Sequence, residues 1–118
     1  MLPLTDDTLW AILNDELEDG TVNHLVGESL GYCETSDGWD TSAVDVAWAE
    51  KYPEPPNFIE SRPATVQLTR SIPKPDKQLL KEELGFKGYS VDQLVPRLTR
   101  RATMVSWLLS YRKQPTGG

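Results

Sequence analysis

The chain has 118 residues, of which 38% are hydrophobic and 25% are charged, and its formal net charge is −6. This length and composition predict one domain with a single core and exclude a wholly disordered chain. The longest apolar runs are only a few residues long, whereas a membrane-spanning helix needs about 20, so we expect no membrane association.

The first residues resemble neither a signal peptide nor a transit peptide, because residues 1–4 lead directly into Asp6 and Asp7. We therefore expect a soluble, cytoplasmic protein. Residues 1–118 are expected to form a single domain with a frayed tail at residues 115–118.

Cys33 is the one cysteine of the sequence and His24 the one histidine. A single cysteine excludes an intramolecular disulfide, and these two residues are too few for a usual zinc site. Asp37, Asp40 and Asp45 could ligate Ca²⁺, but they lack EF-hand spacing, which favours a solvated acidic surface. We expect no bound metal and no cofactor.

Acidic and basic residues are unevenly distributed along the chain. Residues 1–60 contain 14 acidic residues and one basic residue, whereas residues 61–118 contain 4 acidic and 11 basic residues. The two halves could neutralise each other in the folded chain, or the basic half could bind an anionic partner. We favour neutralisation within the fold.

Two helices are expected before residue 32. Thr5 is the predicted N-cap of the first and Gly20 its predicted end. Its apolar residues recur at helical spacing: Leu9, Ile12, Leu13 and Leu17. Acidic residues crowd its C-terminal end, which predicts a basic group nearby. Thr21 is the predicted cap of the second helix and Gly31 its end, with His24 exposed or weakly paired with Glu28.

The middle of the chain predicts a small β element. Residues 32–41 indicate a hairpin or tight loop around Asp37-Gly38, followed by a short helix near residues 45–51 with Trp48 inward. Residues 52–56 predict an extended connector, which is favoured over a docking peptide for a proline-recognition domain. Thr65 to Ile72 alternates in polarity, apart from Arg70, and predicts a strand.

The C-terminal part predicts more helix. Pro75 suits the first position of a helix over residues 76–84 that ends at Gly85. Ser90 and Gln93 match a capping box, and Pro96 opens a last helix that runs to about Lys113. The predicted fold class is α+β: a predominantly helical single domain of about four to five helices with a small β-hairpin or a two- to three-stranded sheet. A helical protein with a minimal hairpin is the alternative.

Three segments carry a resemblance to a known family: residues 61–73 (SRPATVQLTRSIP), residues 77–89 (KQLLKEELGFKGY) and residues 98–111, with LTRRAT and SWLLSY. Trp39-Asp40 and YPEPP at residues 52–56 add to it. They resemble a family of small proteins of cyanobacteria and plastids that is classed as a domain of unknown function. The resemblance implies a photosynthetic source and a soluble protein, and it brings no activity and no catalytic residues.

The last predicted helix is apolar over more than half of its circumference. Its apolar residues are Leu98, Ala102, Met104, Val105, Trp107, Leu108, Leu109 and Tyr111. Such a helix usually lies at the centre of a core, which is the favoured interpretation. Alternatively, Trp107 and Tyr111 belong to a second face that is presented to a partner.

Three arginines crowd the start of that helix, where the helix dipole disfavours positive charge: Arg97, Arg100 and Arg101. They require a negative partner, either the acidic end of the first helix, which is favoured, or a phosphate or carboxylate of another molecule. The candidate partner- or anion-binding residues are therefore Arg97, Arg100, Arg101, Trp107, Tyr111 and Arg70.

The sequence contains no G-x-S-x-G, no P-loop and no G-x-G-x-x-G motif, and it offers no catalytic residues. We expect a non-enzymatic protein–protein interaction or assembly and regulatory factor with an unknown protein partner. The alternative is binding of nucleic acid or a phosphate ligand by the basic half, through Arg62, Arg70, Lys74, Arg97, Arg100 and Arg101. The net charge of −6 opposes this alternative.

Overall fold

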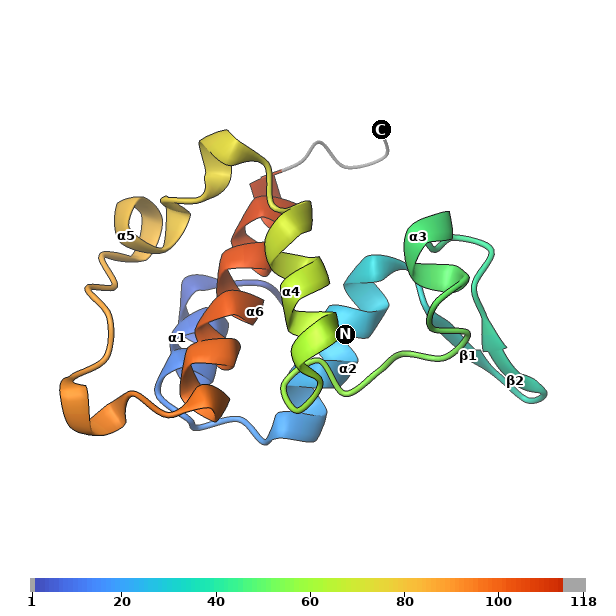
Figure 1. Ribbon diagram of the computed structural model, residues 1–118, viewed down its shortest axis with the longest axis horizontal. Coiled ribbons are helices and arrows are strands. Elements are labelled where there is room, and N and C mark those ends of the chain that lie inside the picture. The colour runs from blue at the N-terminus through green and yellow to red at the C-terminus, as the bar shows by residue number, and fades with distance from the viewer. Residues whose placement is uncertain (1, 114–118) are drawn as a thin grey trace.

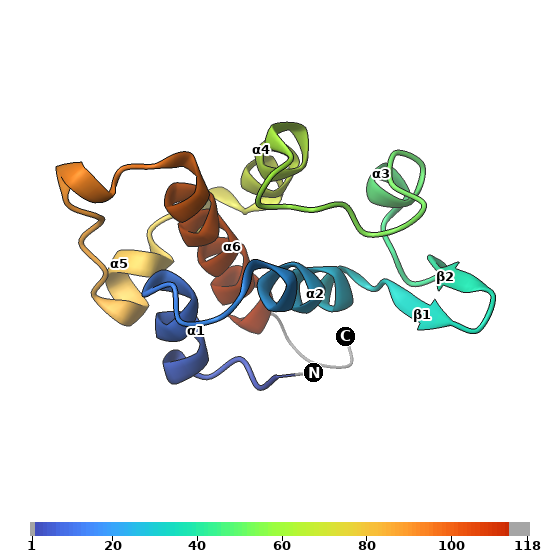
Figure 2. The ribbon, with the colours of Figure 1, turned by 90° about the horizontal axis from the view of Figure 1, so that it is seen from below.

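The structure is a computed structural model that describes residues 2–113. Its elements are α1 (Asp6–Leu13), α2 (Asp19–Leu30), β1 (Cys33–Thr35), β2 (Gly38–Asp40), α3 (Val46–Ala49), α4 (Arg62–Ser71), the 3-10 turn η1 (Lys74–Asp76), α5 (Leu79–Leu84), the 3-10 turn η2 (Val91–Gln93) and α6 (Pro96–Lys113). α6 contacts α1, α2, α4 and α5. In Figure 2, α4 lies on one side of α6, and α1 and α2 lie on the other.

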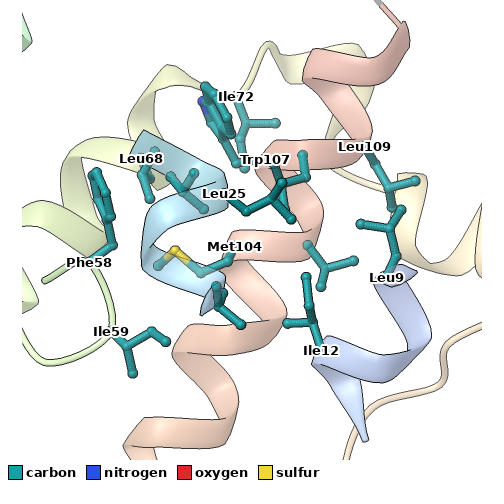
Figure 3. Packing of buried hydrophobic residues seen from close by; sticks show 14 of the residues in the cluster. Leu9, Ile12, Leu25, Phe58, Ile59, Leu68, Ile72, Met104, Trp107 and Leu109 are labelled. Carbon is teal, nitrogen blue, oxygen red and sulfur yellow. The ribbon is translucent and has the colours of Figure 1, made fainter. Parts of the chain in front are cut away.

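The hydrophobic core is built around α6 (Figure 3). Leu9 and Ile12 of α1, Leu25 of α2 and Leu68 of α4 surround α6. All four side chains are buried. Met104, Val105, Leu108 and Leu109 of α6 are also buried, which confirms that the last helix is central to the core.

The start of α1 is confirmed, but its end is not at Gly20. Thr5 caps the helix, because its side chain accepts from the backbone N–H of Thr8. α1 ends at Leu13, since Asp15 adopts a left-handed conformation with φ 60°. The backbone N–H groups of Asp15 and Glu16 then bond back to the last turn of α1, as in a Schellman motif.

This early turn moves the start of α2 as well. Glu18 is the N-cap, so Gly20 and Thr21 lie inside α2 and the prediction of Thr21 as the cap is wrong. The end at Gly31 is confirmed, with φ 111°. His24 pairs with Glu28 on the exposed face of this helix, also as expected.

The predicted hairpin and the short helix after it are confirmed. β1 and β2 are antiparallel, with Glu34 opposite Trp39 and Thr35 opposite Gly38. α3 begins after Asp45, whose carboxylate accepts from the N–H of Ala47, and Trp48 points into the core with 4% of its surface exposed. The hairpin and α3 lie together at one end of the molecule, away from α5 (Figure 1).

The predicted strand at Thr65–Ile72 is wrong, because residues 65–71 belong to α4 and Ile72 is its C-cap. Ser61 caps α4. The buried residues of this helix follow helical spacing: Ala64, Thr65 and Leu68. The Thr65 hydroxyl donates to the backbone carbonyls of Phe58 and Ser61, just before α4. This hydrogen bonding satisfies the buried hydroxyl group of a β-branched residue inside a helix. Arg70, which interrupted the predicted apolar face of a strand, lies on the solvent side.

The helix expected over residues 76–84 is divided into η1 and α5, although its end at Gly85 is confirmed. Asp76 lies at the division, where its buried carboxylate turns toward α6 and accepts from Ser110 and Lys113. The capping box of Ser90 and Gln93 is confirmed at η2, and α6 begins at Pro96 as expected.

The predominantly helical α+β prediction is therefore confirmed, with six α-helices and one two-stranded sheet in residues 2–113. The predicted frayed tail lies outside the described residues. None of the helices described is both long and apolar enough to cross a bilayer.

Candidate functional site

The arginines at the start of α6 are held by the chain itself. Arg97 donates from Nη1 and Nη2 to the carboxylate of Asp15 at 2.9 and 2.7 Å, and from Nε to Asp19 at 2.9 Å. These hydrogen bonds hold the pKa of both aspartates below the usual value. The counter-charge thus comes from the acidic end of the α1 region, which neutralises these charges within the fold.

Arg101 is fully buried at the same place, with 0% of its surface exposed. Its guanidinium donates to the carbonyls of Ile12 and Leu17 at 3.1 and 2.6 Å, and to the Asp19 carboxylate at 2.6 Å. Arg97 and Arg101 together therefore supply the positive charge that the acidic end of the first helix predicts. Arg101 also satisfies backbone acceptors where the chain leaves α1.

Arg100 points the other way, toward the segment that leads into α4. Its Nη1 donates to the carbonyls of Ile59 and Glu60 at 3.0 and 3.1 Å. Arg97, Arg100 and Arg101 thus join α6 to two separate connections of the chain. All three guanidinium nitrogens of Arg97 and of Arg101, and Nη1 of Arg100, donate to acceptors of the fold.

Trp107 and Tyr111 stack on each other, with ring centroids 5.6 Å apart and an interplanar angle of 14°. Trp107 is 9% exposed, so most of its surface belongs to the core, whereas Tyr111 is 36% exposed. Trp107 also reaches the wall of a surface hollow that it shares with Arg70. The structure therefore brings together Arg70 and Trp107, and separately Arg97 and Arg101, whereas Arg100 lies apart from them at Ile59 and Glu60.

Arg70 belongs to a distinct stripe on the solvent face of α4. Arg62, Val66 and Arg70 are four residues apart, so they follow one another along the same face at intervals of about 6 Å. Arg62 and Arg70 are exposed and Val66 is partly buried. Within residues 2–113, neither arginine has a hydrogen bond or ion pair.

A hollow of about 640 Å³ lies beside this stripe, between α3 and α4, and is called here the α3–α4 hollow. Its lining residues are Ala47, Lys51, Arg62, Pro63, Val66, Gln67 and Arg70. A second hollow of about 530 Å³ shares Ala47, Gln67 and Arg70 with it and reaches Trp48 and Trp107. The two therefore adjoin along α4.

Several contacts hold α3, α4 and the connector between them in place. Gln67 Nε2 donates to the carbonyl of Ala47 at 3.3 Å and so links α4 to α3 directly. The buried ring of Trp48 packs edge-on against Phe58, with centroids 5.7 Å apart. Tyr32 donates to the carbonyl of Tyr52 at 2.7 Å and ties the following connector to the end of α2. The hollow is therefore a preformed feature of the fold.

The α3–α4 hollow has a lining that is partly basic and partly apolar. Lys51, Arg62 and Arg70 supply positive charge, and Ala47, Pro63 and Val66 supply apolar surface. Lys51 lies over the Tyr52 ring, 5.7 Å from its centroid. Within the described part of the chain, no His, Cys, Ser, Thr, Asp or Glu lines this hollow. Throughout residues 2–113, no cluster of three His, Cys, Asp or Glu side chains could hold a metal ion.

Comparison with known proteins places the chain in a family. The family model described as "Domain of unknown function (DUF1823)" matches residues 3–113. The chain belongs to this family. A protein solved by solution NMR is similar to the DUF1823 chain, with 60% sequence identity, 95% of each chain covered and a TM-score of 0.81. A search of curated proteins found no match to the DUF1823 chain.

Sequence reasoning named two cations of the α3–α4 hollow in this DUF1823 chain, Arg62 and Arg70, but missed Lys51 and Val66. A strand at Thr65–Ile72 places Val66 on the apolar side and leaves Arg62 outside the element. Helical periodicity instead places Arg62, Val66 and Arg70 on one face. Ser61 as a cap with Pro63 in the first turn was the signal for a helix.

Proposed function

We propose that the protein is a non-enzymatic interaction or assembly factor that binds a protein partner through the α3–α4 hollow. The main observation in its support is the position of Arg62. This arginine lies in the first turn of α4, where a cation is unfavourable to the helix dipole, and no acidic side chain in residues 2–113 pairs with it. A charge that the fold does not use is explained by a partner outside the fold.

A protein surface fits the α3–α4 hollow better than a small molecule does. Small-molecule sites bury most of the ligand surface. Here Ala47, Pro63 and the three cations are themselves exposed, so the hollow is shallow and a small ligand would remain in contact with water. Apolar surface bordered by polar and charged groups is the usual composition of a protein–protein interface.

We base the proposed cellular setting on the resemblance to proteins of cyanobacteria and plastids. It supports a photosynthetic source, and we place the protein in the cytoplasm without a cofactor. The absence of recognisable catalytic motifs from the sequence supports a protein that is not an enzyme.

Binding of nucleic acid or a phosphate ligand is the second candidate function, because Lys51, Arg62 and Arg70 line one hollow without an acidic lining residue. Two observations oppose it. The net charge of −6 repels a polyanion, and no aromatic residue lines the α3–α4 hollow to stack on a base.

Site-specific photo-crosslinking in a cyanobacterial extract tests the proposed function. A photoreactive amino acid at position 66 is expected to give a discrete crosslinked protein, whereas the same group at exposed Glu82 on α5 gives none. Excess unmodified protein should abolish the product, and excess Arg62→Glu/Arg70→Glu protein should not. A product equally strong from both positions, or none from position 66, overturns the proposed function.

A further inference from the structure

The spacing of charges along α4 specifies what kind of partner segment fits. Arg62 and Arg70 are separated by two turns, about 12 Å along the helix axis, and Val66 lies midway between them. A partner helix with carboxylates eight residues apart and an apolar residue midway has the same period. Its carboxylates reach both arginines when its apolar side chain lies on Val66.

We infer that the α3–α4 hollow binds an acidic amphipathic helix of another protein, laid along α4. The inference rests on the proposed function and adds the chemistry of the partner. Charge complementarity supports it, because the first hollow is lined by three cations and by no acidic residue. The adjoining hollow contributes one carboxylate, Asp45, which is engaged as the N-cap of α3.

The helical conformation of the partner follows from backbone hydrogen bonding. The elements that border the hollow are helices α3 and α4, and none of its described lining residues belongs to a strand. An extended peptide therefore finds no strand edge along which to pair, whereas a helix satisfies its own backbone groups. Arg62 and Arg70 supply planar donors that match carboxylate groups.

Three arginines outside the α3–α4 hollow are paired within the fold. Arg97 and Arg101 are bound to Asp15 and Asp19, and Arg112 is bound to Asp6. Arg62 and Arg70 differ from these three, because no ion pair within residues 2–113 engages them and they line the α3–α4 hollow. Some cations of the basic C-terminal half are thus paired with acidic residues of the N-terminal half, whereas Arg62 and Arg70 at the α3–α4 hollow remain unpaired by any described residue.

The test uses the full chain and three alanine-based helical peptides. The first carries Glu, Leu and Glu at four-residue intervals, the second has the same composition with these residues on different faces, and the third carries Lys, Leu and Lys. Amide shift perturbations at residues 46–51 and 62–71, with calorimetric affinities, are the measurements. We expect the first peptide to bind at least about tenfold more tightly than the other two.

Charge exchange provides the specificity control. Arg62→Glu/Arg70→Glu should weaken the Glu peptide about tenfold or more and gain binding of the Lys peptide. Lys81→Glu/Lys87→Glu changes the net charge equally on exposed residues outside the hollow and should leave the affinity for the Glu peptide within about twofold. Equal losses in both double variants, or equal binding of the first two peptides, overturn the inference.

The two proposals can fail separately. A single-stranded oligonucleotide that binds the hollow more tightly than the Glu peptide overturns both and favours the nucleic-acid alternative. A competitor-sensitive crosslink at position 66 without binding of the Glu peptide retains the protein partner and overturns the acidic helix. Absence of the crosslink counts against the proposed function, whatever the peptides do.

Discussion

Arg101 and Asp19 are 82 positions apart in the sequence, and Nη1 of Arg101 donates to Oδ1 of Asp19 at 2.6 Å. The arginine side chain is fully buried, whereas the aspartate side chain is 28% exposed. The same guanidinium also donates to the carbonyls of Ile12 and Leu17. One side chain of the last helix therefore holds the connection between the first two helices.

Replacing Arg101 should destabilise the protein strongly. Arg101→Ala removes the donors for Ile12 O, Leu17 O and Asp19, and we expect a loss of about 3 kcal/mol in the free energy of unfolding, measured by urea denaturation. Arg101→Lys should not restore it, because a single ammonium cannot reproduce the fork of the guanidinium.

Arg100→Ala is the matched control for Arg101→Ala. Arg100 donates from one nitrogen to the carbonyls of Ile59 and Glu60 and is only partly buried. We expect a loss of about 1 kcal/mol. Equal losses for the two variants would contradict the anchoring role of Arg101.

The carboxyl groups of Asp15 and Asp19 should make the free energy of unfolding depend on pH in the acid range. Hydrogen bonds from Arg97 lower the pKa of both carboxyls from the ordinary value of 3.8. Their contribution is therefore fully present above about pH 4 and is lost as the pH falls through their lowered values in the folded state. The free energy of unfolding should decline over this acid range.

The variant Asp15→Asn/Asp19→Asn should be less stable than the native protein at neutral pH and should show a shallower decline in acid, since neither amide titrates. Urea denaturation at a series of pH values measures both effects. Asp37→Asn, at an exposed position without an ion pair in residues 2–113, should keep the native pH profile. A native slope in the double variant would rule out this linkage.

Most of the predicted helix caps and turns, though not Gly20 and Thr21, were correct because their signals are local. Thr5, Gly31, Gly85 and the Ser90–Gln93 box each act within a few residues of their own position, and all four were placed correctly. The hairpin around Asp37-Gly38 follows from the same kind of signal.

The errors arose where distant contacts decide the local conformation. Asp15 ends α1 in a left-handed conformation that few residue types favour, and Arg97 from α6 holds its carboxylate there. Thr65–Ile72 has β-branched residues and alternating polarity, yet its burial against α6 follows helical spacing. Because residues 65–72 were predicted as a strand, the face of α4 that lines the α3–α4 hollow could not be predicted, and Val66 at its centre was missed.

Gly31 should tolerate substitution less than Gly38 does. Both have positive φ, at 111° and 127°, so alanine is strained at either position. A Cβ at Gly31 would also collide with the backbone of Ala43, whose carbonyl carbon would lie 2.8 Å away, whereas a Cβ at Gly38 meets nothing within 4 Å. We expect losses of about 3 kcal/mol for Gly31→Ala and about 1 kcal/mol for Gly38→Ala in urea denaturation. Similar losses would show that the close approach to Ala43 is not rigid.

Asp76 should control how firmly α5 is attached to the central helix. Its carboxylate is buried and accepts from Ser110 Oγ and Lys113 Nζ, both at 2.8 Å. Asp76→Ala leaves the buried Ser110 hydroxyl without its acceptor, and we expect a loss of about 2 kcal/mol and faster amide hydrogen exchange in α5.

Two further variants separate the partners of Asp76. Ser110→Ala removes one neutral donor, with an expected loss of about 1 kcal/mol. Lys113→Met removes an ion pair whose lysine side chain is 55% exposed, with an expected loss below about 1 kcal/mol. Because Asp76 serves both partners from a buried position, its replacement should have the largest effect of the three. If Lys113→Met were as damaging as Asp76→Ala, the ion pair rather than the buried hydrogen bond would hold η1 and α5 on α6.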